Sequence, residues 1–156
     1  MKFVCALLLV LTSLALAETF STLRMQILNG KAILLVDSPP AVNDAVEAAN
    51  RIVGKPYKPG GGHGPEEDDG YDCSGATSYV LRAAGVLEGA LSSSGFKEFG
   101  EPGPGEWISI YHRPGHVFLV IAGARFDTTD SANVGPGWRE ADRFDQGFVV
   151  RHPKGM

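Results

Sequence analysis

Hydrophobic positions recur at helical spacing in the first half of the chain and in short runs in the second half. A helix is predicted from Ser38-Pro39-Pro40, because proline is tolerated in a first turn. Its apolar stripe comprises Val42, Ala45, Val46, Ala49, Ile52 and Val53. A second helix is predicted behind Asp72, a good N-cap residue, and it should end near Gly85. Its apolar positions are Ala76, Val80, Ala83, Ala84 and Leu87.

The second half of the chain predicts strands separated by turns. The run 116–122, HVFLVIA, is almost continuously apolar, which is typical of a central strand covered on both faces. Further strands are expected at 107–111, 125–128 and 147–152, with a turn at 112–115 and loops at 90–105 and 131–146. Helices that precede strands favour an α+β fold, with helices packed on a central antiparallel sheet.

The N-terminus has the pattern of an export signal. Residues 1–17 combine one lysine, a short apolar run and the small-x-small site Ala15-Leu16-Ala17, so we expect cleavage before Glu18 and a secreted protein. The run is too short to span a membrane comfortably. We expect residues 18–40 to form an N-terminal extension and residues 41–156 to form the single main domain. In the extension, Asn29-Gly30 predicts a hairpin, although a helix ending there is an alternative.

Charge and composition exclude several classes of function. The formal net charge is −4, and loss of Lys2 with the signal makes it −5. The sequence has no block of Lys or Arg, which argues against nucleic acid or an anionic membrane as partner. The four histidines show no zinc spacing, so we expect no metal and no cofactor. We expect a monomer.

Cys73 is the candidate nucleophile. Of two cysteines, Cys5 lies in the signal, so the mature chain keeps one thiol that has no internal disulfide partner. A thiol at the amino end of a helix feels the positive end of the helix dipole, which favours the reactive thiolate. The alternative is a small buried side chain. His116 begins the central strand after a glycine and could take the thiol proton, which tips the balance toward catalysis.

The segment 54–72, between the two helices, is rich in glycine and acidic residues. Three consecutive glycines allow a close backbone approach, but no phosphate-loop motif follows them. The acidic run 66–69 is expected to be solvated, or alternatively to attract a cationic group of a substrate. His63 is expected to be an ordinary loop histidine.

These motifs together resemble a known family. Tyr57 with Gly60-Gly61, the DCSG sequence 72–75 on a helix, and Gly115-His116-Val117 on a strand are similar to the NlpC/P60 cysteine peptidases. The similarity runs from about Ala41 to His152. It implies a papain-like fold with the nucleophile at a helix N-terminus, and cleavage of peptidoglycan stem peptides, typically between D-glutamate and a diamino acid.

The resemblance also implies roles for individual residues. Cys73 would be the nucleophile and His116 the general base, while Tyr57 would lie near the oxyanion. Asp72 and Ser74 would contact the amino group of the peptide. A further serine that contacts the substrate would be Ser92.

The third catalytic position departs from the family, which usually has a polar residue there, often histidine. Counting from His116 gives Thr128, with Asp127 beside it. A carboxylate orients an imidazole and stabilises its charged form, so we expect Asp127 to fill the position and keep Thr128 as the rival. A shift of one residue in the preceding turn would exchange the two.

The sequence therefore predicts a secreted cysteine peptidase that acts on peptidoglycan peptides. A catalytically silent domain that binds wall peptides is the alternative, and a thiol acyltransferase is a more distant one.

Overall fold

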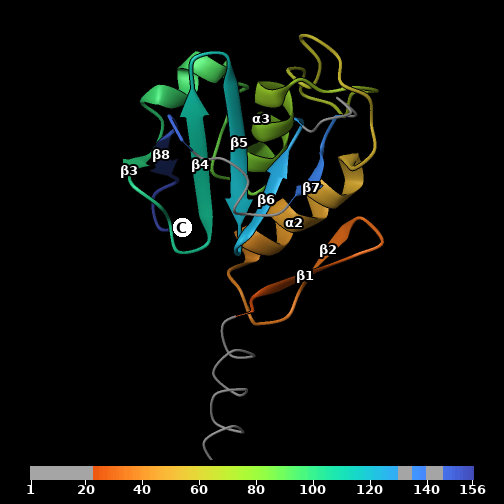
Figure 1. The fold of residues 1–156 in the computed structure, drawn as a ribbon, viewed down its shortest axis with the longest axis vertical. Helices are drawn as coiled ribbons and strands as arrows, with labels where there is room; N and C mark the ends of the chain where they lie inside the picture. The colour runs from red at the N-terminus through yellow and green to blue at the C-terminus, as the bar shows by residue number, and fades with distance from the viewer. Residues whose placement is uncertain (1–22, 130–134, 140–145) are drawn as a thin grey trace, which may run out of the picture.

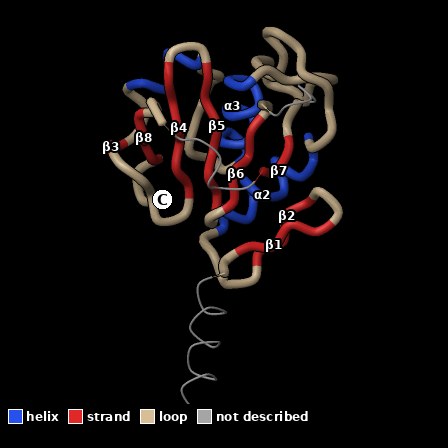
Figure 2. Tube along the Cα trace, viewed as in Figure 1, coloured by secondary structure: helices blue, strands red, loops and turns tan. Residues whose placement is uncertain are grey.

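The computed structural model describes residues 23–129, 135–139 and 146–156. Its centre is a six-stranded sheet with the order β3-β8-β4-β5-β6-β7, and all neighbouring pairs in it are antiparallel (Figures 1 and 2). The strands are β3 (Glu101–Pro102), β4 (Ile108–Arg113), β5 (His116–Ile121), β6 (Ala124–Asp127), β7 (Gly137–Arg139) and β8 (Val149–His152). The predicted α+β class with an antiparallel sheet is confirmed, and β5 lies inside the sheet as expected.

Two helices cover one face of this sheet (Figure 1). Helix α2 (Pro40–Ile52) has proline in its first turn and buries Val42, Ala45, Val46, Ala48, Ala49 and Ile52, close to the predicted stripe. Helix α3 (Cys73–Ala83) begins at the Asp72 cap and ends before Gly85, which has a φ of +70°. The expected burial of Ala83 is wrong: it is exposed, whereas Val80, Leu81 and Ala84 around it are buried.

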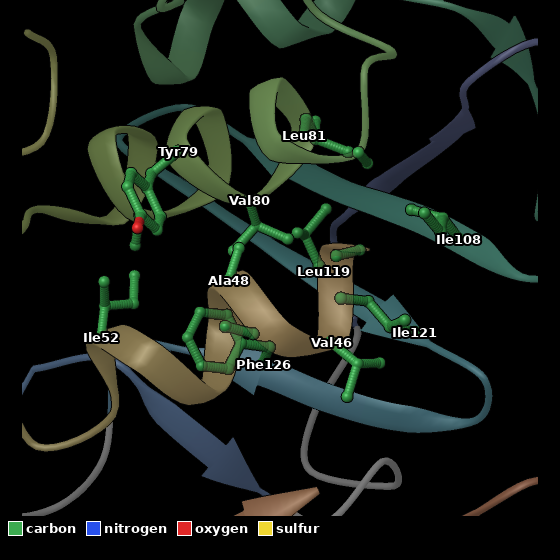
Figure 3. Close-up of a cluster of buried hydrophobic side chains, with 14 of the residues drawn as sticks. Val46, Ala48, Ile52, Tyr79, Val80, Leu81, Ile108, Leu119, Ile121 and Phe126 are labelled. Atoms are coloured by element: carbon green, nitrogen blue, oxygen red, sulfur yellow. The ribbon is translucent and has the colours of Figure 1, made fainter. Parts of the chain in front are cut away.

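The core lies between the helices and the sheet. Figure 3 shows Val80 of α3 beside Leu119 and Val46 of α2 beside Ile121, with Ile52 of α2 below Tyr79 of α3. Alternation along β5 sends Val117, Leu119 and Ile121 into this core. Burying apolar surface on this scale is the main favourable contribution to folding.

The extension contains the predicted hairpin, formed by β1 (Met25–Leu28) and β2 (Lys31–Leu34). Asn29 and Gly30 have φ values of +51° and +77°, as a type I′ turn requires. Asn50 of α2 bonds both the N–H and the C=O of Ala32 at 2.8 Å, and it accepts a hydrogen bond from Nε1 of Trp138 at 2.9 Å. One amide side chain thus joins the hairpin, α2 and β7.

Several predicted loops contain regular structure. The turn predicted at 112–115 consists of only Pro114-Gly115. His112 therefore belongs to β4, where it is buried. The segment 90–105 contains the 3-10 helix η1 (Ser93–Lys97) and β3, and the segment 131–146 contains β7. These elements are too short for a hydrophobic period to show in the sequence.

The predicted signal peptide, residues 1–17, and the expected mature start, Glu18, lie outside the described residues. Within the described part of the chain, no helix is long and apolar enough to cross a membrane.

Candidate active site

Cys73 is the first residue of α3 and carries a free, buried thiol. The side chain of Asp72 caps the helix by accepting from the backbone N–H of Gly75 at 2.7 Å. This cap fixes where α3 starts, and it therefore fixes the thiol at the positive end of the helix dipole.

The glycine-rich segment packs directly on the first turn of α3. A Cβ on Gly75 would lie 1.8 Å from the carbonyl oxygen of Gly61, and the N–H of Asp72 donates to that same oxygen at 3.2 Å. The close backbone approach expected from the three glycines is thus confirmed, and its partner is the helix that carries Cys73.

His116 lies at the start of β5 and is held by a carboxylate. Its Nε2 is 3.0 Å from Oδ1 of Asp127 and 3.2 Å from Oγ1 of Thr129. Its side chain is only 13% exposed, and that of Asp127 is fully buried. Cys73 lies close enough to His116 to interact with it electrostatically.

Arg125 holds the second carboxylate oxygen of Asp127. Nε of Arg125 is 3.0 Å from Oδ2, and Nη2 of Arg125 bonds the same oxygen. The guanidinium also lies 3.7 Å from the ring centroid of Phe118. Two fixed donors on one oxygen leave the other oxygen directed at His116. Neither Arg125 nor Thr129 was singled out from the sequence, although Arg125 lies two residues before Asp127 on the same face of β6.

Thr128, the rival third residue, is buried, and its hydroxyl has no partner among the described residues. It does not reach His116. The carboxylate that does is Asp127, at the end of β6.

The site favours a charged imidazole. Burial alone would favour the neutral ring, but the hydrogen bond to Asp127 and the negative charges of Asp127 and Cys73 raise the pKa of His116 to about 9. Burial likewise disfavours the Asp127 carboxylate, yet His116 and Arg125 hold the pKa of Asp127 below its usual value. Both pKa shifts favour an ion pair in which His116 is an imidazolium and Asp127 is a carboxylate.

Asp72 and Ser74 flank Cys73 in the chain, and both contact His63. Oδ1 of Asp72 accepts from Oγ of Ser74 at 3.0 Å and lies 3.1 Å from Nε2 of His63. Oγ of Ser74 is also 3.3 Å from that nitrogen. His63 thus belongs to one hydrogen-bonded group with Asp72 and Ser74, which its interpretation as an ordinary loop histidine did not anticipate. The sequence carried no signal for this, because a loop histidine acquires partners only through the fold.

Tyr57 lies close enough to Cys73 to interact with it electrostatically. Partial burial and the negative charges of Cys73 and Asp72 raise the pKa of Tyr57. Tyr57 is 39% exposed. A bridge between Tyr57 and Tyr71 ties this residue to the segment before Asp72.

Ser92 makes hydrogen bonds with residues close to it in the chain. It caps η1 by accepting from the N–H of Gly95 at 3.3 Å, and its hydroxyl is 2.9 Å from that of Ser94. The described interactions of Ser92 do not include Cys73 or His116, so the structure does not bring it into their hydrogen-bonded group.

The acidic run 66–69 is partly neutralised by two lysines of the same segment. Glu67 pairs with Lys55 at 2.7 Å, and Asp68 pairs with Lys58 at 2.8 Å. Lys58 also reaches Asp69 at 2.7 Å. These contacts shape the loop and offset two of the four negative charges, so the run keeps a net negative charge. The described residues contain no cluster of three or more His, Cys, Asp or Glu side chains suited to a metal.

Comparisons with known proteins identify the fold. No protein-family model matches the chain, and no curated protein sequence does. An NlpC/P60 family protein from Bacillus cereus ATCC 10987 is similar in structure, with a TM-score of 0.58 and 17% identity over 74% of this chain and 41% of that one. This chain therefore spans less than half the length of the Bacillus protein.

Two single domains match over nearly their whole length. The P60 domain of an antigen from M. avium subspecies paratuberculosis has a TM-score of 0.56 and 21% identity, over 73% of this chain and 96% of that one. The NlpC/p60 domain of the peptidoglycan hydrolase SagA has a TM-score of 0.50 and 22% identity, over 71% of this chain and 98% of that one. The chain thus has an NlpC/P60-like α+β fold.

Proposed function

We propose that this protein is a cysteine peptidase that hydrolyses peptidoglycan stem peptides, at the bond between D-glutamate and a diamino acid. The observation that carries the proposal is the arrangement of Cys73 at the start of α3 beside His116, whose ring is bonded to the buried Asp127. The peptidoglycan substrate is inferred from the NlpC/P60-like fold and from the hydrolase SagA, whose domain is similar in structure.

In the proposed reaction His116 takes the proton of Cys73, and the resulting thiolate attacks the peptide carbonyl carbon. The backbone N–H of Cys73 and the hydroxyl of Tyr57 stabilise the oxyanion. The carbon–nitrogen bond breaks, and the leaving amine takes the proton from His116. Water then gives a proton to His116 as its oxygen attacks the thioester, which releases the acid and restores the thiolate. Asp127 holds His116 in orientation and stabilises its charge.

Digestion of purified wall fragments, with mass analysis of the products, tests the proposal. We expect wild-type protein to release a new amine on the diamino acid and a new carboxylate on D-glutamate, and Cys73→Ala to release neither. His152→Ala is the control, since His152 lies on β8 and its ring bonds the carbonyl oxygen of Gly103.

Other outcomes would identify the alternatives. Binding of fragments without any cleavage would indicate a silent wall-binding domain. Products joined to an added amine, rather than hydrolysed, would indicate an acyltransferase.

Export is part of the proposal. It rests on the pattern of residues 1–17, and N-terminal sequencing of secreted material would check it by showing whether the mature chain begins at Glu18.

A further inference from the structure

Arg113 lies beside the candidate general base, at the closed end of the hairpin that β4 and β5 form. It is the register partner of His116, and only Pro114-Gly115 separates the two residues in the chain. Directly opposed side chains of an antiparallel pair point to the same face of the sheet, with Cβ atoms about 4.5–5.5 Å apart. Arg113 therefore projects from the same face as His116, one strand away.

The guanidinium of Arg113 is held over an aromatic ring and has no acidic partner among the described residues. It lies 4.7 Å from the ring centroid of Phe148, and that ring packs edge-on against His116, with 6.1 Å between the ring centroids. Arg113 is exposed, whereas Arg125 is buried and bonds Asp127. A ring offers no carboxylate oxygen, so the N–H donors of Arg113 keep their capacity for charge-assisted hydrogen bonds.

The position of His116 indicates which part of a substrate Arg113 would meet. In the proposed reaction the leaving amine takes its proton from His116, so the residue that carries this amine must come within hydrogen-bond reach of the imidazole. For the proposed bond, that residue is the diamino acid. A carboxylate on it would match the planar fork of a guanidinium. The formal net charge of the chain is −4, so an anionic group needs a local cation to be held there.

We propose that Arg113 is a specificity-determining residue that binds a carboxylate of the diamino acid on the leaving side of the scissile bond. The proposal rests on the proposed function for its substrate class. The carboxylate has two possible sources. One is a side-chain carboxylate, which diaminopimelate has and lysine lacks. The other is the terminal carboxylate of a peptide that ends at the diamino acid.

Binding to a form that cannot cleave tests this apart from catalysis. In a Cys73→Ala background, calorimetry would measure the affinity of alanyl-γ-D-glutamyl tripeptides that end in diaminopimelate or lysine, each with a free or an amidated terminus. We expect the peptide with both carboxylates to bind about tenfold or more tightly than the lysine amide, which has neither. The peptide with a single carboxylate that keeps this ratio identifies the source.

Variants at position 113 then assign the ratio to the guanidinium. Arg113→Gln should lower the ratio by about tenfold and leave the affinity for the lysine amide unchanged. Arg113→Lys should keep part of the ratio, because lysine retains the charge but not the planar fork. Arg82→Gln is the control for the loss of one positive charge and should leave the ratio unchanged. Arg82 lies in the last turn of α3, at the end of the helix opposite Cys73.

The proposal is overturned if the ratio with Arg113 present is near one, if Arg113→Gln leaves it as it was, if Arg82→Gln lowers it equally, or if no peptide binds. Wall digestion by the wild type decides the proposed function separately. A protein that cuts wall fragments without an Arg113-dependent ratio would keep the proposed function and lose this inference. A protein that shows the ratio but cuts nothing would keep the carboxylate site and lose the peptidase.

Discussion

Asp127 ends β6 and Thr128 follows it directly, yet only one of the two side chains has hydrogen-bond partners among the described residues. The Asp127 carboxylate bonds His116 and Arg125, whereas the Thr128 hydroxyl is buried without a partner among the described residues. Successive side chains of a strand point to opposite faces, so only one of the two can serve His116.

We therefore expect Asp127→Asn to slow hydrolysis by about 10- to 100-fold, because it removes the charge that stabilises the imidazolium. The loss should be smaller than in a Ser-His-Asp system, since a thiolate–imidazolium pair depends less on its third member. Thr128→Val keeps the volume and should leave the rate near that of the wild type. Hydrolysis rates of both variants on the same peptide would show which residue supports His116. A large loss in Thr128→Val beside a near-normal Asp127→Asn would contradict the assignment.

The sequence left the choice between Asp127 and Thr128 open because it depends on the length of the turn between β5 and β6. Ala122 and Gly123 have φ values of +48° and +89°, so the link between β5 and β6 is a tight two-residue turn. That turn pairs Val120 with Arg125 and so places His116 and Asp127 on the same face. A turn one residue longer would have put Thr128 there instead.

At the scale of elements, the site depends on how closely the segment 54–72 approaches α3. Glycine at position 75 lets the carbonyl of Gly61 lie against the first turn of the helix. Alanine normally stabilises a helix relative to glycine by up to about 1 kcal/mol, but here its methyl group has no space.

Gly75→Ala should therefore displace the loop that carries Tyr57 and His63 and reduce hydrolysis by about 100-fold or more, since small misplacements near the chemistry are this costly. Gly64→Ala is the matched control, because a Cβ there meets nothing within 4 Å. Hydrolysis rates and helical circular dichroism of both variants would be compared. Normal activity in Gly75→Ala would show that the loop can move without harm to the site.

At the scale of the whole molecule, the charge state of the site is linked to stability. The pKa of His116 is raised from 6.5 to about 9 in the folded protein. Between these values the folded state holds a proton that the unfolded state has lost, so the stabilisation is complete below pH 6.5 and disappears as the pH rises toward 9.

We expect the free energy of unfolding to fall as the pH rises from 6.5 to 9, and to fall less steeply in His116→Gln. Urea denaturation across this pH range would measure both slopes. Parallel curves for the two proteins would mean that His116 is not held as an imidazolium in the folded state.

The sequence by itself determined the order of the main elements, the place of Cys73 behind an N-cap and the place of His116 at the head of a buried strand. These follow from local chemistry: helical spacing of apolar residues, a capping aspartate, and a glycine before an apolar run. The tight Asn29-Gly30 hairpin was predicted for the same reason.

Only the tertiary structure decided which side chains meet around those two residues. The β5–β6 register selected Asp127, and packing of the glycine-rich loop on α3 brought His63 to Asp72 and Ser74. Strand β7 and the burial of His112 were likewise missed. Such pairings join segments far apart in the chain, and local spacing in a single sequence carries no information about them.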